Sequence, residues 1–265
     1  KGKLNMKVFI HIGLPKTATT FFQTKVFGNL DQREIWYNPE NIMKYIFKTV
    51  GEIHSEVELK DIKKNISNEF DKISPAKILI SHEGLTEIEY RMDYKKQLYF
   101  LKKVFPEAQI ILFLRFQPDL ISSLYKEAVH QGHCKGSIKE FFNGENMEAI
   151  QRDLVIDPYD YDYKNIIKDL TEAFSKENVH IFFYENFNRN RAGTINEICK
   201  LLDVTNRPVK TTVYRRSLSS FSLNILINLN KVCEKIGFSV PCNIQYKTKW
   251  LKLARIPLRE GIRNR

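Results

Sequence analysis

Cysteine is scarce, and long apolar runs are missing. The 265 residues include four cysteines, at positions 134, 199, 233 and 242, and no Cys-x-x-Cys pair. Their irregular spacing argues against a zinc site or a disulfide framework and favours reduced thiols, although a bridge between Cys233 and Cys242 stays open. No run of 18 apolar residues and no signal-peptide pattern occurs. We therefore expect a soluble, cytoplasmic protein. Because the sequence begins at Lys1 rather than Met, a removed N-terminal anchor or signal is an open alternative.

Acidic residues are outnumbered by basic ones, 31 to 42, which gives a formal net charge of +11. Such a charge attracts anions, including nucleotides, nucleic acids, acidic glycans and membrane surfaces. Hydrophobic residues at 43% and aromatics at 12% indicate a packed globule rather than a disordered chain. Repeats and low-complexity linkers are absent, so we predict a single domain over residues 1–265. It would carry an insertion at about 31–74 and a C-terminal helical segment at about 219–265.

Short apolar runs alternate with amphipathic segments along most of the chain. Strands are predicted at residues 6–12, 77–80, 109–114 and 179–184, and helices at 17–28, 94–105, 118–131, 163–174, 193–202 and 221–232. A weaker helical pattern covers residues 52–70, with one apolar face formed by Ile53, Val57, Ile62, Ile66 and Phe70. The run 109–114 is too apolar for a one-sided sheet and is expected at the centre of a parallel sheet covered on both faces. The pattern predicts an α/β fold with three layers, α/β/α, around a central, mostly parallel sheet.

A Thr-rich turn, Gly-Leu-Pro-Lys-Thr-Ala-Thr-Thr at residues 13–20, follows the first predicted strand. A turn that opens a helix at this edge of a sheet presents backbone N–H groups and a positive dipole to an anion. Gly13 permits the tight departure, and Lys16 supplies a positive charge. Hydroxyl donors come from Thr17, Thr19 and Thr20. The turn predicts a site for a phosphate-like group. It is not a Walker A motif, because Pro15 stands where that motif requires glycine.

Residues 11–20, His-Ile-Gly-Leu-Pro-Lys-Thr-Ala-Thr-Thr, resemble the 5′-phosphosulfate loop of sulfotransferases that use 3′-phosphoadenosine 5′-phosphosulfate (PAPS). In that family the loop reads PKxxTT or PKSGTT. A second family signature is an Arg at the end of a central strand and a Ser about eight residues later, which together hold the 3′-phosphate. Arg115 and Ser123 match it, so the resemblance covers residues 6 to 130.

This resemblance implies that PAPS is the sulfuryl donor, that 3′,5′-adenosine bisphosphate is the product, and that no metal is needed. It also implies a P-loop-like phosphosulfate-binding turn. The residues implied to bind the donor are Gly13, Pro15, Lys16, Thr17, Ala18, Thr19, Thr20, Arg115 and Ser123. Arg216, in Tyr-Arg-Arg-Ser at 214–217, is added because guanidinium groups suit a 3′-phosphate. The RKG and GDW sequences of the cytosolic small-molecule enzymes are absent here, which favours the bacterial and carbohydrate-type branch.

The implied chemistry is in-line attack of an acceptor hydroxyl or amine on the sulfur. Lys16 is expected to stabilise charge on the leaving phosphate. Glu83 is the favoured base and His82 the alternative, because both follow the second strand, where the sheet would place them beside the Lys16 loop. His11 is expected to be structural, and Glu185 to pin a loop rather than take part in catalysis.

Two other functions stay open on the sequence. A P-loop kinase would use ATP and Mg²⁺ but would need the glycine that Pro15 replaces. A non-enzymatic module could bind polyanions through the basic tail at 247–265. The expected acceptor is a glycan or another small molecule, and no nucleic-acid partner is expected. The sequence predicts neither the acceptor's identity nor the oligomeric state.

Overall fold

The computed structural model describes residues 6–49, 55–73, 75–82, 85, 94–132, 134–142, 162–205 and 219–235. The chain divides into two compact units. The first contains Lys1–Phe116 and Tyr161–Thr211, and the second contains Gln117–Asp160 and Thr212–Arg265. The single domain expected from the sequence stays a prediction.

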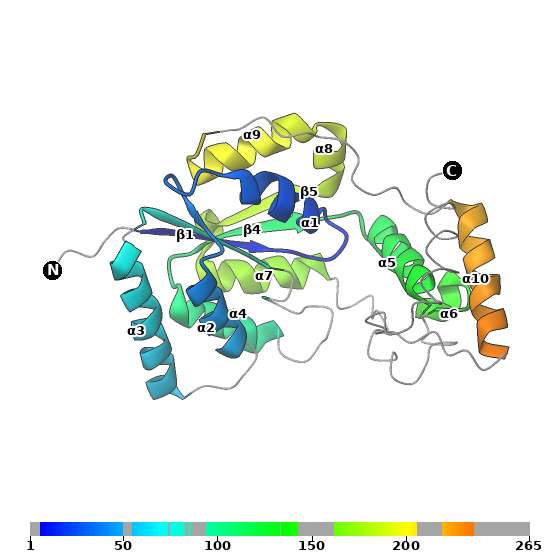
Figure 1. Ribbon diagram of the computed structural model, residues 1–265, viewed down its shortest axis with the longest axis horizontal. Helices are drawn as coiled ribbons and strands as arrows, with labels where there is room; N and C mark the ends of the chain where they lie inside the picture. Colours follow the sequence, from blue (N-terminus) through cyan, green and yellow to red (C-terminus); the bar gives the residue numbers. More distant parts are fainter. Residues whose placement is uncertain are drawn as a thin grey trace, which may run out of the picture. The chain divides into compact units, whose positions relative to one another are not determined.

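The first unit is built on a five-stranded sheet in the order β2-β3-β1-β4-β5 (Figure 1). Every neighbouring pair is parallel. The strands are β1 (Lys7–Ile12), β2 (Trp36–Tyr37), β3 (Lys77–His82), β4 (Gln109–Leu114) and β5 (Val179–Phe183). The predicted α/β fold is therefore confirmed. The run 109–114 is an interior strand, as its apolar character requires, but the middle position belongs to β1, because the chain adds strands on both of its sides.

Helices cover both faces of the sheet and complete the three layers, as Figure 1 shows for the first unit. Alternate residues of each strand point to opposite faces, so Ile10 of β1 packs into one core and Phe9 into the other. The Ile10 face is covered by α2 (Glu40–Thr49), α3 (Glu56–Ile73), α4 (Tyr94–Val104) and α7 (Tyr163–Phe174). The Phe9 face is covered by α1 (Thr19–Phe21), a π-helical segment (Phe22–Val26), a 3-10 turn (Phe27–Asn29), α8 (Tyr184–Arg189) and α9 (Arg191–Leu202).

Several local features differ from the prediction. The helix expected over residues 17–28 is split into α1, the π-helical segment and the 3-10 turn. In α3 the buried stripe runs through Leu59, which is 5% exposed, whereas Val57 is 68% exposed. The sequence pattern had placed Val57 on the inner face, so the predicted phase of this helix was wrong there. Tyr184, expected to end a strand, begins α8.

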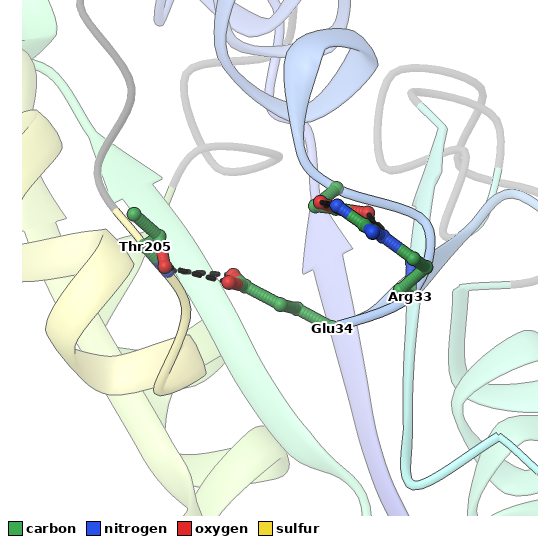
Figure 2. A network of polar contacts seen from close by, with 4 residues as sticks. Arg33, Glu34 and Thr205 are labelled. Atoms are coloured by element: carbon green, nitrogen blue, oxygen red, sulfur yellow. Dashed lines mark hydrogen bonds and ion pairs between the residues drawn. The ribbon is translucent and has the colours of Figure 1, made fainter.

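The end of α9 is tied to the segment before β2 (Figure 2). Thr205 donates from its backbone N to Glu34 Oε2 at 2.7 Å and from its hydroxyl to Glu34 Oε1 at 2.6 Å. Nearby, Lys77 Nζ lies 2.8 Å from Asp203 Oδ2. These exposed contacts add little stability individually, but together they fix where α9 ends against the sheet.

The second unit contains α5 (Gln117–Gln131), α6 (Ile138–Phe142) and α10 (Ser220–Lys235). Within it, Asn230 Nδ2 donates to Val129 O at 2.9 Å, and the Tyr125 hydroxyl donates to Gly136 O at 2.8 Å. Cys134 and Cys199 are buried free thiols. The predicted Cys233–Cys242 alternative and the basic tail at 247–265 lie outside the side chains that the structure describes. Across the described helices, none is long and apolar enough to span a membrane.

Candidate functional site

The turn after β1 has an unusual backbone. Lys16 and Ala18 both have positive φ, 58° and 69°, while Thr17 between them does not. A non-glycine residue in the left-handed region costs about 1–2 kcal/mol, so each position is strained. Backbone that alternates in handedness turns successive N–H groups toward one point and forms an anion-binding nest. Residues 13–20, hereafter the Lys16 loop, thus contain two left-handed residues directly before α1.

Two threonine hydroxyls form hydrogen bonds within the Lys16 loop. Thr17 and Thr19 are buried, and their Oγ1 atoms donate to Leu14 O at 2.6 and 3.1 Å. These two hydroxyls had been expected to face the anion, but the structure uses them to hold the turn. The hydroxyl hydrogens of Thr17 and Thr19 are therefore engaged within the loop, whereas Thr20 is exposed at the start of α1. Ala18 is the N-cap residue of α1.

Arg115 reaches the Lys16 loop from the end of β4. Its Nη1 donates to Lys16 O at 2.9 Å, and its guanidinium carbon lies 4.4 Å from the centre of the Tyr184 ring. Among the described residues, its buried Nε has no hydrogen-bond partner. Lys16 and Arg115, which lie 99 residues apart in the sequence, thus meet in one place.

The backbone on both sides of the Arg115 side chain is also held. The Tyr163 hydroxyl donates to Arg115 O at 2.6 Å, and burial raises the pKa of this phenol, which keeps it protonated as a donor. Phe116 N donates to Glu185 Oε1 at 3.0 Å. Glu185 therefore fixes the chain just after β4, as the sequence had indicated. Tyr163, Tyr184 and their contacts were not predicted, because their spacing carries no family signature.

His82, the alternative base, ends β3, which flanks β1 on the side opposite to β4 and Arg115. The register pairs Ile12 with His82, so His82 lies beside the strand end from which the Lys16 loop departs. Its side chain is exposed. Glu83, the favoured base, lies outside the described residues. The chain after β1 packs on the Phe9 face, whereas α4, which follows β3, packs on the Ile10 face. Neighbouring strands whose connections leave to opposite faces define the switch point where open α/β sheets bind ligands.

Ser81, just before His82, is held by three side chains. Asn38 accepts from Ser81 N at 2.7 Å and donates to Ser81 O at 2.9 Å, which continues the β2–β3 ladder with a side-chain amide. Asn38 itself has a φ of 43°, a conformation that asparagine tolerates well. Gln23 Nε2 donates to Ser81 O at 3.3 Å, and His11 Nδ1 lies 2.7 Å from the Ser81 hydroxyl.

His11 is enclosed below the Lys16 loop. It is 0% exposed, and its ring contacts the rings of Phe22, Phe27 and Phe113. Burial lowers its pKa from 6.5 to about 3, so the imidazole stays neutral near neutral pH. A buried neutral histidine bonded to a serine fits the structural role expected from the sequence.

Two further donor-site residues were predicted from the sequence, Ser123 and Arg216. Ser123 lies half-buried on α5 of the second unit. Arg216 and its neighbours at 214–217 lie outside the described residues. Within the described ranges, no group of three or more His, Cys, Asp and Glu side chains is placed to hold a metal ion.

Solved structures that are similar to this chain include sulfotransferases. The chain is similar to a sulfotransferase from Alicyclobacillus acidocaldarius, with a TM-score of 0.53 and 15% identity over 90% of this chain and 96% of that one. It also matches a sulfotransferase domain from the curacin biosynthetic pathway (TM-score 0.43, 16% identity, 78% and 77% covered). A third match is mouse sulfotransferase SULT7A1 complexed with PAP (TM-score 0.41, 13% identity, 89% and 68% covered).

No protein-family model matches the sequence, and no curated protein matches it either. At these identities the likeness to the Alicyclobacillus enzyme shows the fold alone. The resemblance drawn from the Lys16 loop and Arg115 is thus confirmed at the level of the fold: this is the three-layer α/β/α fold of a sulfotransferase.

Proposed function

We propose that this chain is a PAPS-dependent sulfotransferase of the bacterial or carbohydrate type, which transfers a sulfuryl group to a hydroxyl or amine of an acceptor, expected to be a carbohydrate. The observation that carries the proposal is the contact between Arg115 Nη1 and Lys16 O. It joins the Lys16 loop to the arginine of the second signature beside β1, in a fold that is shared with a sulfotransferase. A fold alone hosts many activities, so the proposal depends on these residues.

The donor-site residues divide into two groups with different tasks. The Lys16 loop offers backbone N–H groups and one ammonium to the phosphosulfate end, where negative charge grows as the S–O bond to the leaving phosphate breaks. Arg115 suits the 3′-phosphate, with Ser123 and Arg216 as the expected further ligands. Each of these groups is a hydrogen-bond donor or a cation, so together they complement a donor that carries several negative charges.

The acceptor must lose one proton as its oxygen or nitrogen bonds to sulfur. Glu83 or His82 accepts that proton in the proposed reaction, and 3′,5′-adenosine bisphosphate leaves with the electron pair of the broken S–O bond. His82 lies beside the departing loop, on the strand that neighbours β1. We keep Glu83 as the favoured base because sulfotransferases that act on glycans use a glutamate, and replacing each residue separately decides between them.

Calorimetric titration with 3′,5′-adenosine bisphosphate in the absence of metal tests the donor site. We expect binding, weakened about tenfold to a hundredfold in Lys16→Ala, because a charge-assisted hydrogen bond contributes about 1.5–3 kcal/mol. Lys64→Ala, which removes an exposed lysine of α3, is the matched control and should bind normally. A preference for ATP with Mg²⁺ would instead support a kinase. Steeply salt-dependent polyanion binding that ignores Lys16 would support the binding module.

A further inference from the structure

We propose that Arg115, held by Tyr184, is also a positioning residue for the Lys16 loop, so that it supports the 5′-phosphosulfate end of the donor as well as the 3′-phosphate end. The role toward the donor rests on the proposed function, whereas the role of Arg115 in holding the Lys16 loop does not. The guanidinium of Arg115 contacts the backbone of the loop itself.

The first step is the strain at Lys16. A non-glycine residue with positive φ persists only where its surroundings hold it. Arg115 Nη1 donates to the carbonyl of this same residue at 2.9 Å, which fixes the orientation of the peptide between Lys16 and Thr17. That peptide also contains the N–H of Thr17, which in a trans peptide points opposite to the Lys16 carbonyl. The contact therefore sets the direction of a loop N–H group that an anion would meet.

The second step is how Arg115 is itself held. Its guanidinium stacks on the Tyr184 ring, and Tyr184 packs against Phe187 with ring centres 6.4 Å apart. Phe187 in turn lies 5.2 Å from the ring of Phe21 and 4.9 Å from that of Phe22. Those two residues continue the chain directly after the Lys16 loop. The contacts form a closed ring that braces the loop through Arg115 on one side and through its own helix on the other.

The third step is that only an arginine suits both tasks. A guanidinium has five N–H donors in a planar fork, so one can hold Lys16 O while others meet a phosphate. Its flat face stacks on Tyr184, which a lysine ammonium would not reproduce with the same geometry. Here the buried Nε of Arg115 has no partner within the described part of the chain, which leaves it for a ligand oxygen.

Hydrogen exchange of the ligand-free protein tests the positioning role directly. We expect the amides of residues 13–20 to exchange about tenfold or more faster in Arg115→Gln and in Tyr184→Leu, because one charge-assisted bond to the loop is lost or misdirected. Tyr184→Phe keeps the ring and should restore the wild-type rate. Arg33→Gln, which removes an exposed arginine paired with Asp31, is the matched control. Unchanged loop exchange in Arg115→Gln would overturn the proposal.

A ligand pair extends the test to the donor. If Arg115 bound only the 3′-phosphate, Arg115→Gln would weaken 3′,5′-adenosine bisphosphate and leave adenosine 5′-phosphosulfate, which lacks that phosphate, unaffected. We expect both affinities to fall, each by about tenfold or more. A selective loss for the bisphosphate would refute the positioning role. If the wild-type protein bound neither compound, the proposed function would fail, and the exchange experiment would still decide whether Arg115 organises the loop.

Discussion

Acid should destabilise this protein through one buried histidine, His11. The perturbation is His11→Asn, whose side-chain amide can replace Nδ1 in the contact with the Ser81 hydroxyl but cannot titrate. The folded state keeps the imidazole neutral, with a pKa of about 3 instead of 6.5, because burial disfavours the charged form. The unfolded chain binds a proton once the pH falls below 6.5. The stability tied to the neutral form is therefore fully present above pH 6.5 and is lost as the pH falls toward 3.

The size of the loss follows from the difference in proton binding. Each pH unit between the two pKa values costs up to about 1.4 kcal/mol of unfolding free energy. At about pH 5 the loss from His11 alone is therefore about 2 kcal/mol relative to neutral pH. No discount for solvent screening applies, because His11 is 0% exposed and surrounded by aromatic rings. Carboxylates also titrate in this range, but they do so equally in wild type and variant, so the difference isolates the histidine.

Urea denaturation followed by tryptophan fluorescence measures this. Trp36 lies on β2, so a Trp250→Phe background makes the signal report on the sheet of the first unit. His11→Asn is expected to be less stable than the wild type at neutral pH, because the smaller side chain leaves a small cavity. Between neutral pH and about pH 5, its unfolding free energy should fall by about 2 kcal/mol less than that of the wild type. Parallel pH curves for the two proteins would show that His11 is not held neutral, and the reasoning would be refuted.

Two further substitutions test the local structure of the site. Ala18→Gly should raise the unfolding free energy by about 0.5–1 kcal/mol, because relief of the left-handed strain at this position outweighs the greater flexibility of glycine in the unfolded chain. The midpoint of urea denaturation measures this change. A lower midpoint in Ala18→Gly would contradict the strain. Asn38→Gly tolerates the positive φ but removes both bonds to Ser81, so it should cost about 1–3 kcal/mol. An unchanged midpoint there would mean that the amide does not hold β3.

Much of the fold was predictable because its signals are local. The strand at 109–114 and the helix at 163–174 match β4 and α7 to the residue, since each is a complete apolar or amphipathic pattern. The two-residue strand β2 is too short for any periodicity to reveal. Helix α2 lies within a segment of mixed aromatics and charges, which was expected only as an insertion. In α3 the choice between Val57 and Leu59 depends on what the helix packs against, which the sequence alone does not contain.

The candidate residues of the site could be proposed from the sequence by type, but their contacts could not be predicted. Lys16 and Arg115 carry recognisable patterns, whereas Asn38 and Ser81 are 43 positions apart and meet only because β2 pairs with β3. Tyr184 is likewise adjacent to Arg115 only through the pairing of β4 with β5. Such contacts follow from the order of the strands, and that order depends on connections that no single segment encodes.

The strand order also determines which residues surround the Lys16 loop. A turn of the form Pro-Lys-x-x-Thr-Thr could follow any strand, but here it follows β1, the middle strand of the sheet. The neighbouring strands β3 and β4 bring His82 and Arg115 to the two sides of β1. The connections after β1 and β3 leave toward opposite faces, which is the arrangement at which α/β sheets bind ligands. The Lys16 loop therefore has Arg115 from β4 on one flank and His82 from β3 on the other, which is the arrangement that the proposed function uses.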